Sequence, residues 1–265
     1  MTIKLVALDL DDTLLDSKLA VSPRACEAIR LAKAQGVIVT IATGRMYCSA
    51  LPYARQLGLD VPLITYNGAL IKTSMSGEIL LHQPVEKEPA KQALELCRER
   101  DWYIQTYVND QLYVKEFDQY AEFYSRLSGA PAIALGDAFF TSDEQPTKML
   151  TMSTPEGISE MYNTFKAVFG NKLNIAISKP TFMEITDPSA NKGRALAFLA
   201  DKLRISQEEI MAVGDGGNDL DMVKYAGWGV AMGNASAAVK AAARLQTQSN
   251  DADGVAEAIE RYVLK

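Results

Sequence analysis

Short apolar runs and amphipathic stretches alternate along the first part of the chain. Residues 3–8, 37–42 and 62–66 are such runs, and the second is β-branched and continuous rather than alternating. A continuous run is typical of a strand that is covered on both faces. Ser22 and Pro23 suit the start of a helix between the first two runs. The order strand, helix, strand, helix, strand predicts a parallel sheet.

The pattern changes between residues 84 and 187. Several strand-like pieces there alternate between apolar and polar positions, as in a sheet with one open face. Asn109 and Asp110 suit a hairpin turn between two of these pieces. The pattern predicts helices over residues 86–100, 118–127 and 155–169, and strands over residues 102–108, 111–115, 148–152, 173–178 and 183–186. This order favours a separate α+β domain inserted into the first one.

The alternation of strands and helices resumes after Asp187 and Pro188. Asn191 suits the cap of a helix over residues 192–203, and a buried strand over residues 210–213 is expected next. The remaining elements are expected to be a helix over residues 220–225, a strand over residues 228–232, and helices over residues 235–244 and 254–263.

These patterns predict an α/β fold with a Rossmann-like, doubly wound parallel-sheet core and an inserted α+β cap. The core is expected over residues 1–83 and 188–265, and the cap over residues 84–187. The length of 265 residues and the hydrophobic content of 48% suit two domains, or one large domain, with a sizeable apolar core.

Composition and charge narrow the class of partner. The net charge of -6 and the absence of basic runs argue against nucleic acid or an anionic membrane surface. No apolar run approaches the ~20 residues that span a bilayer, and the first residues lack the pattern of a signal peptide. Cys26, Cys48 and Cys97 have no metal-ligand spacing and are expected to be buried, reduced thiols. A cytoplasmic protein is expected.

Polar clusters follow the apolar runs at the points where ligands bind doubly wound sheets, beyond the carboxyl ends of the strands. Asp9 and Asp11 follow the first run, and Thr43 and Gly44 follow the second. Asn191 and Lys192 open a helix, and a glycine-rich acidic loop covers residues 215–219. These clusters are expected to converge.

Asp9 and Asp11 are two residues apart, so their side chains point to one side of an extended chain. Carboxylates that face one cavity are costly unless a cation neutralises them, and Asp215 could complete a metal site. Ligands that are all oxygens indicate Mg²⁺ rather than zinc. A carboxylate can also be a nucleophile that forms an aspartyl-phosphate, with a second carboxylate moving protons. The Thr43 hydroxyl, backbone N–H groups and Lys192 could bind phosphoryl oxygens.

The sequence resembles the haloacid dehalogenase-like (HAD) phosphatases. Four segments match the motifs of that family in order: Asp9-x-Asp11-x-Thr13, Thr43 after an apolar strand, Lys192, and Gly214-Asp215-Gly216-x-Asn218-Asp219. The Thr-Gly-Arg triplet that starts at Thr43, the segment Tyr66–Ala69 and the insertion after it resemble the Cof-type subfamily of sugar-phosphate phosphatases. The resemblance extends over essentially the whole chain.

The resemblance implies roles for the acidic motif residues. Asp9 would be the nucleophile and a ligand of Mg²⁺. Asp11 would be the general acid and base, with its backbone carbonyl also on the metal. Asp215 would bind the metal, Asp219 would support it from outside the ligand shell, and Thr13 would steady the loop after the nucleophile.

The resemblance also implies a phosphate site. The Leu10 backbone, Thr43, Gly44, Lys192 and Asn218 would hold the phosphate.

The sequence does not decide the roles of two residues near these motifs. Asp12 stands where the family often has glycine; alternation along the chain predicts that it points away from Asp9 and Asp11, and it could form an Asx-type turn. Arg45 either contacts substrate or lies on a helix surface.

The expected activity is Mg²⁺-dependent hydrolysis of phosphate monoesters of small metabolites, with sugar phosphates as the expected class. The alternative is a phosphotransferase or phosphomutase that uses the same aspartyl-phosphate. A phospho-accepting receiver module also clusters aspartates at a sheet edge, but the long insertion argues against one. The cap is expected to select the substrate.

Overall fold

The computed structural model describes residues 2–264 and divides the chain into two compact units. The first, here called the core unit, consists of Met1–Leu81 and Asn191–Lys265, and the second, the cap unit, is His82–Ala190.

The core unit contains a five-stranded sheet in the order β14-β13-β12-β1-β2, and its neighbouring strands are parallel. This confirms the expected parallel-sheet α/β core. The strands are β1 (Leu5–Leu8), β2 (Ile38–Ile41), β12 (Ile210–Gly214), β13 (Trp228–Ala231) and β14 (Leu245–Gln246). The first strand in sequence therefore lies between the second strand and one that comes about 200 residues later.

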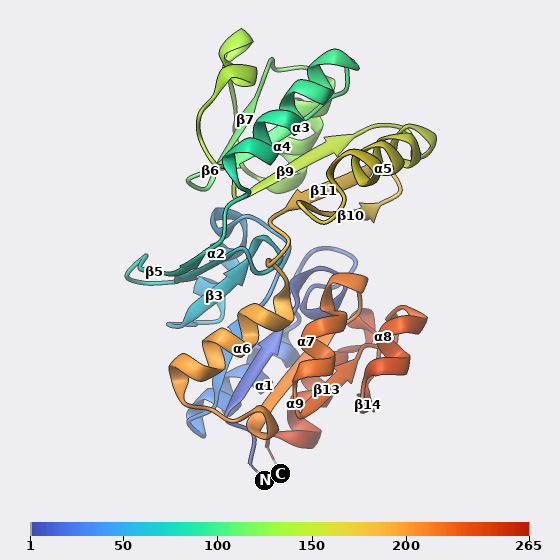
Figure 1. Cartoon of the computed structure of the whole chain (residues 1–265). Coiled ribbons are helices and arrows are strands. Elements are labelled where there is room, and N and C mark those ends of the chain that lie inside the picture. Colours follow the sequence, from blue (N-terminus) through green and yellow to red (C-terminus); the bar gives the residue numbers. More distant parts are fainter. Residues whose placement is uncertain (1, 265) are drawn as a thin grey trace. The chain divides into compact units, whose positions relative to one another are not determined.

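Helices connect these strands. They are α1 (Pro23–Ala34), α2 (Tyr47–Gln56), α6 (Lys192–Leu203), α7 (Leu220–Tyr225), α8 (Ala237–Ala242) and α9 (Gly254–Tyr262). Right-handed crossovers that leave the middle of the sheet in opposite directions place α1 and α7 on opposite faces. Helix α1 packs with α9, and α6 packs with α7 (Figure 1). All four residues of β1 are fully buried, which explains its continuous apolar run.

The sequence signals for two helix starts are confirmed. The Ser22 hydroxyl accepts a hydrogen bond from the Ala25 N–H at 3.1 Å, and α1 begins at Pro23. The Asn191 side chain accepts one from the Arg194 N–H at 2.7 Å, so α6 begins at Lys192. Helix α8 is shorter than the alanine-rich pattern predicts: it begins after Ser236, whose hydroxyl accepts from the Val239 N–H at 3.5 Å, and it ends at Ala242.

The third apolar run forms a small sheet of its own. Strand β3 (Pro62–Thr65) pairs antiparallel with β4 (Leu70–Thr73), which lies beside β5 (Ile79–His82). A single parallel bridge between Ala42 and Ile64 joins β3 to the end of β2. The third strand of the predicted parallel sheet is thus placed beside β2, while its main partner is a hairpin strand that the sequence analysis missed.

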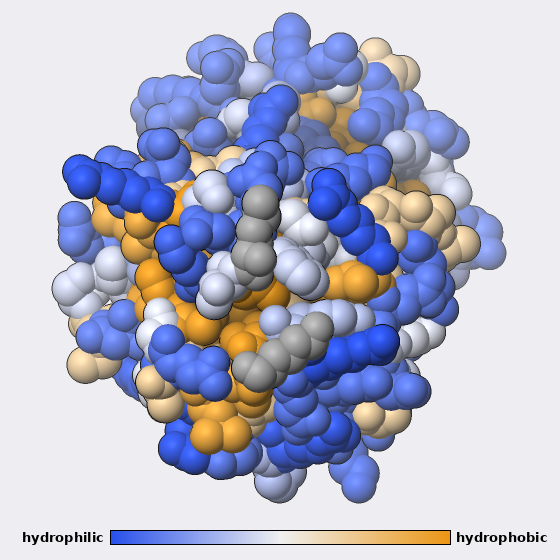
Figure 2. All heavy atoms as spheres, turned by 90° about the horizontal axis from the view of Figure 1, so that it is seen from below, coloured by the Kyte–Doolittle hydropathy of each residue, from blue (hydrophilic) through white to orange (hydrophobic). Residues whose placement is uncertain are grey.

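The two edges of the core sheet differ in character. Both termini lie at the edge formed by the amino ends of the strands (Figure 1). Figure 2 looks onto that face, which is largely hydrophilic and shows hydrophobic residues in several places. The polar clusters singled out in the sequence follow the carboxyl ends of β1, β2 and β12, at the opposite edge.

The cap unit contains a six-stranded sheet in the order β10-β11-β9-β6-β7-β8. Its pairs are antiparallel except for β7 with β8. The strands are β6 (Gln105–Val108), β7 (Gln111–Val114), β8 (Ala132–Ala134), β9 (Lys148–Met152), β10 (Asn174–Lys179) and β11 (Phe182–Thr186). Asn109 and Asp110 have φ of 51° and 62°, which confirms the predicted hairpin turn.

Three helices belong to the cap unit: α3 (Lys87–Glu99), α4 (Gln119–Ser128) and α5 (Pro155–Phe169). Apolar residues of α3 and α5 pack with Met149, Met183 and Ile185 on one face of the sheet, and this is the core of the unit. Strand β8 and a 3-10 turn over Gly136–Thr141 were not predicted from the sequence. No helix within residues 2–264 is long and apolar enough to cross a membrane.

The cysteines differ from the expectation that all three are buried. Cys97 is buried, Cys26 is partly exposed, and Cys48 is exposed. Helix α3 buries Cys97 because it lies on the apolar side of that helix. Periodicity alone did not distinguish the three positions.

Gly68 offers a test of how closely the turn after β3 approaches helix α6. Its φ is +97°, and a Cβ there would lie 2.4 Å from the backbone oxygen of Asn191, the residue that caps α6. We expect Gly68→Ala to lower the free energy of unfolding by about 2–5 kcal/mol, from the left-handed backbone and the clash together. Equilibrium denaturation measures this change.

Gly77→Ala is the matched control for that substitution. Gly77 also has positive φ, +69°, but its Cβ would meet only the Lys72 side chain, at 3.7 Å. We expect a loss of about 1–2 kcal/mol from the backbone alone. Equal losses for the two variants would contradict the close approach of the turn to α6.

Candidate active site

The register of the core sheet brings three segments to one edge. Leu8 pairs with Val213 on one side and with Ile41 on the other. The Asp9 N–H donates to the Val213 carbonyl at 3.1 Å, which extends the pairing by one residue. Asp9 and Asp215 therefore lie at the point where the strand order reverses between β1 and β12, a usual place for ligands in doubly wound sheets.

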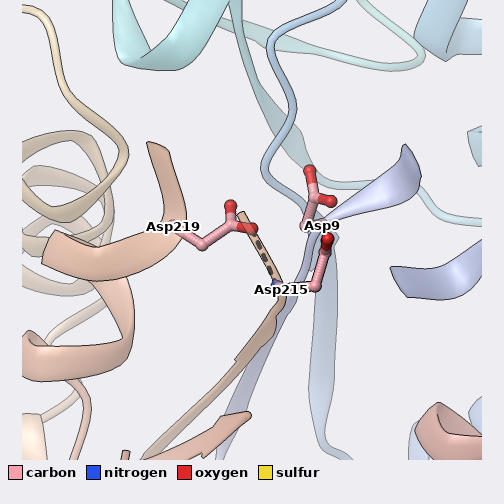
Figure 3. Close-up of side chains that lie close together, drawn as sticks. All are labelled: Asp9, Asp215 and Asp219. Carbon is pink, nitrogen blue, oxygen red and sulfur yellow. Dashed lines mark hydrogen bonds between the residues drawn. The ribbon is translucent and has the colours of Figure 1, made fainter. Parts of the chain in front are cut away.

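Three carboxylates gather at this point. Asp9, Asp215 and Asp219 each offer an oxygen within 4.8 Å of the others. In Figure 3, Asp9 and Asp215 rise side by side from the ends of two neighbouring strands, and Asp219 approaches from the loop before α7. Asp9 and Asp219 are buried, and Asp215 is partly exposed. Like charges at this separation repel strongly, so the cluster needs positive charge.

Lys192 supplies part of that charge from the first residue of α6. Its Nζ donates to Asp9 Oδ1 at 2.6 Å and to Asp219 Oδ1 at 2.5 Å. The lysine side chain is fully buried. Burial alone would lower the pKa of Lys192, but the charges of Asp219 and Asp9 outweigh burial and raise it, so the ammonium stays charged.

The pKa values of Asp9 and Asp215 are raised despite the charge of Lys192. Burial first, and then the charge of Asp219, raise the pKa of Asp9 well above its ordinary value, against the effect of Lys192. Burial is also the main cause that raises the pKa of Asp215 to about 7, with the charges of Asp219 and Asp12 adding to it. A hydrogen bond from Thr13 Oγ1 to Asp215 Oδ1, at 2.8 Å, acts in the other direction. The site holds more negative charge than Lys192 compensates.

The oxygens of the cluster are unequally engaged. Asp219 Oδ2 accepts the N–H groups of Asp215 and Gly216 at 3.0 and 2.9 Å, and its other oxygen accepts from Lys192. Asp219 thereby ties the loop to the lysine. Lys192 donates to Oδ1 of Asp9, and Thr13 donates to Oδ1 of Asp215. Oxygen donors with excess negative charge fit a hard divalent cation such as Mg²⁺.

The loop after Asp9 removes the basis of the prediction that Asp12 points away from Asp9 and Asp11, and that direction stays a prediction. Residues Leu10–Leu14 form a wide turn, in which Asp12 has φ 56° and ψ 12°. Alternation therefore does not apply, because the chain is not extended at Asp12. A left-handed backbone favours glycine, and aspartate tolerates it better than most residues. Asp12 is exposed, and its carbonyl accepts a hydrogen bond from Asn234 Nδ2 at 2.7 Å.

Asp11 has a different partner from Asp9. Arg45 Nη2 donates to Asp11 Oδ1 at 2.6 Å, and Arg45 Nε donates to Asp11 Oδ2 at 2.9 Å. The Asp11 side chain is 48% exposed, whereas that of Asp9 is 7% exposed. The reading of Arg45 as a helix-surface residue is wrong, because its side chain is only 20% exposed and faces Asp11, while a contact with substrate stays a prediction.

The residues expected to hold phosphate lie around the same edge. Thr43 is fully buried, and its hydroxyl accepts from the Arg45 N–H at 3.1 Å. It does not cap a helix, because α2 begins only after Met46. Leu10, fully buried, follows Asp9 directly.

Asn67 is a polar residue of this edge that the sequence analysis did not select. Asn218 Nδ2 donates to Asn67 Oδ1 at 2.9 Å. A Cβ on Gly44 would lie 2.8 Å from the same oxygen. Asn67 is therefore in contact with two candidate phosphate-binding residues. Its only signal in the sequence was its place in the segment Tyr66–Ala69.

Comparisons with known proteins show which family the chain resembles. A family model described as haloacid dehalogenase-like hydrolase matches residues 6–259. The Bacillus subtilis protein named 5-amino-6-(5-phospho-D-ribitylamino)uracil phosphatase YcsE is 33% identical over 267 residues, which cover 99% of this chain and 96% of that protein. The Bacillus subtilis phosphatase YwpJ is 30% identical over 289 residues, which cover 98% of this chain and 100% of YwpJ.

The fold has a similar counterpart among solved structures. A haloacid dehalogenase-like hydrolase from Bacteroides thetaiotaomicron superposes with a TM-score of 0.90 at 32% identity, covering 98% of this chain and 99% of that chain. The resemblance inferred from the sequence motifs is thus confirmed at the level of the family and of the fold. The chain belongs to the haloacid dehalogenase-like hydrolases.

Proposed function

We propose that the protein is an Mg²⁺-dependent phosphatase that hydrolyses phosphate monoesters of small metabolites through an aspartyl-phosphate. The observation that carries this proposal is the buried contact of Lys192 with Asp9 beside Asp215 and Asp219. A nucleophilic carboxylate has to meet a dianionic phosphoryl group, and that meeting needs positive charge and hydrogen-bond donors at one point. Asp9, Asp215 and the backbone carbonyl of Asp11 would hold Mg²⁺, which would offset the negative charge of the carboxylates and the phosphate.

Two chemical steps follow for the side chains. In the first, an Asp9 oxygen forms a bond to phosphorus, the bond to the leaving oxygen breaks, and Asp11 gives that oxygen a proton. In the second, water attacks phosphorus, Asp11 takes its proton, and the bond to Asp9 breaks. Phosphate is released and both carboxyl groups return to their starting states. Asp219 and Thr13 keep Asp215 and its loop in place through their hydrogen bonds.

The phosphoryl oxygens would be held by the groups that surround Asp9. We assign this role to Lys192, the Thr43 hydroxyl, the Asn218 amide, and the backbone N–H groups of Leu10 and Gly44. Buried Thr43 and Lys192 are rigidly placed by β2 and α6, which suits preorganised stabilisation of a transition state. Asn218 is positioned by its hydrogen bond to Asn67.

The proposal for the substrate class rests on the name of a relative. The relative YcsE is named for a phosphate monoester carried on a ribityl chain. Sugar phosphates and related polyol phosphates are therefore the first class to screen, and the cap unit, residues 82–190, is the part proposed to select among them. The alternative is transfer of the phosphoryl group to a sugar. Hydrolysis yields free phosphate and transfer yields isomerised sugar phosphate, so measuring both products distinguishes the two activities.

Substitution of Asp9 tests the nucleophile. We expect Asp9→Asn to abolish phosphate release from a panel of sugar phosphates with Mg²⁺, because an amide oxygen does not form the phosphoenzyme. Asp11→Asn should lower the rate about 10²–10⁴-fold, the usual contribution of a general acid or base. Asp12→Asn, three residues after Asp9 and exposed, should retain wild-type activity. Activity that persists in Asp9→Asn would contradict the mechanism.

The raised pKa of Asp215 predicts a pH dependence of stability. A folded-state pKa of about 7, against 3.8 for the free side chain, means that the folded protein binds the proton more tightly. This contribution to stability is present below about pH 4 and is lost as the pH rises through 7. The Tm of the metal-free protein should therefore fall between pH 5 and pH 8 because Asp215 loses its proton. The Tm of Asp215→Asn should fall less over the same range.

Mg²⁺ should reverse that loss. Protons compete with the cation for the carboxylates, so the increase in Tm caused by Mg²⁺ is expected to be larger at pH 8 than at pH 5. Calorimetry with chelator and with Mg²⁺ at both pH values measures it. An equal increase at both pH values, or one that persists in Asp215→Asn, would count against a metal held by Asp215.

Removal of Lys192 tests the electrostatic balance of the cluster. Lys192→Met keeps the length of the side chain and leaves Asp9 and Asp219 buried without their cation. We expect the free energy of unfolding of the metal-free protein to fall by about 3–5 kcal/mol. Lys4→Met is the control: Lys4 Nζ also lies 2.7 Å from a carboxylate, that of Glu209, but it is 57% exposed. Its loss should stay below about 1 kcal/mol.

A further inference from the structure

Arg45 holds Asp11 by both carboxylate oxygens. The two hydrogen bonds, of 2.6 and 2.9 Å, come from Nη2 and Nε of one guanidinium. A bidentate pair fixes the plane and the direction of the carboxylate, which a single hydrogen bond does not. The wide turn after Asp9 gives Asp11 an exposed side chain, so the turn by itself does not fix that side chain.

Arg45 is itself held at several points. Its N–H donates to the Thr43 hydroxyl at 3.1 Å, and its carbonyl accepts from the Tyr66 N–H at 3.0 Å. Its guanidinium lies over the ring of Tyr53, with Cζ 5.2 Å from the ring centroid. The Arg45 side chain is 20% exposed. Arg45 therefore links Asp11 to the segment that carries Thr43 and to helix α2.

Other arginine–carboxylate pairs in the core unit lack this support. Arg30 contacts both oxygens of Glu27, at 2.7 Å each, but its side chain is 63% exposed. Arg24 contacts both oxygens of Glu260 and is 48% exposed. The Arg45–Asp11 pair differs from them because its arginine is largely buried and packed on an aromatic ring.

We propose that Arg45 is a positioning residue that orients the Asp11 carboxyl for proton transfer, and that Tyr53 in turn orients Arg45. The inference rests on the proposed function, in which Asp11 gives a proton to the leaving oxygen. Proton transfer depends on the placement of the acid at hydrogen-bond distance from that oxygen. A side chain fixed by two bonds and a stacked guanidinium meets that requirement more reliably than an exposed aspartate in a turn.

The experiment compares leaving groups. p-Nitrophenolate leaves without a proton, whereas the alkoxide of a sugar phosphate needs one. The constant kcat/KM depends on the steps up to formation of the phosphoenzyme and does not depend on the later hydrolysis of the phosphoenzyme. For Arg45→Ala we expect kcat/KM to fall about 10–100-fold on the sugar phosphate that the wild type hydrolyses fastest, and less than about threefold on p-nitrophenyl phosphate.

Further variants separate positioning from other roles. Arg45→Lys keeps the positive charge but lacks the two parallel N–H donors of the guanidinium, so it should show most of the same selective loss. Guanidinium ion in solution should restore part of the loss in Arg45→Ala. Tyr53→Leu removes both the ring and the hydroxyl that accepts from Arg45 Nη1 at 3.4 Å, and it should show a smaller loss of the same selectivity. In an Asp11→Asn background, Arg45→Ala should add little further loss.

Arg30→Ala is the matched control, since it removes a bidentate pair of the same chemistry from the surface and should leave both constants unchanged. Equal losses on the two esters, or full additivity with Asp11→Asn, would overturn the inference and assign Arg45 to substrate binding. Unchanged constants in Arg45→Ala would also overturn it. A wild-type protein that releases phosphate from neither ester would instead overturn the proposed function.

Discussion

The contact of Lys192 with Asp9 and Asp219 is the interaction on which the site depends. Three carboxylates meet at one strand edge, and two of them are buried. Burial and mutual repulsion raise the pKa of Asp9, while Lys192 opposes both effects. The lysine can do so only because the Asn191 cap starts α6 at that position. A helix start thus places the cation beside the carboxylates, and the remaining negative charge makes the edge suited to a metal ion.

The topology of the core sheet explains why residues 183 positions apart meet. The chain leaves β1 toward β2 and returns, after the cap unit, to β12 on the other side of β1. Asp9 and Asp215 are therefore neighbours although most of the chain separates them. A large insertion after residue 81 leaves this meeting point intact, because the strand pairs on both sides of β1 belong to the core unit.

Much of the fold could be predicted from the sequence because its signals are local. Helix α5 begins and ends where the periodicity predicts, and Asn191 marks the start of α6. The convergence of the polar clusters followed from the rule for parallel strands. The left-handed backbone at Asp12 and the Arg45–Asp11 pair could not be predicted, since the first depends on a wide turn and the second joins residues 34 positions apart.

The three aspartates of the first loop have the same chemistry and different surroundings. Asp9 is buried against a lysine, Asp11 is exposed and held by a guanidinium, and Asp12 occupies a left-handed turn position. A buried carboxylate whose charge is partly offset by a fixed lysine would suit the proposed attack on phosphorus. An accessible carboxyl would suit the proposed proton exchange with a leaving group or with water. Asp9 and Asp11 lie in these two environments on either side of Leu10, so the local backbone would allow neighbouring residues of one type to take the different parts proposed for them in one reaction.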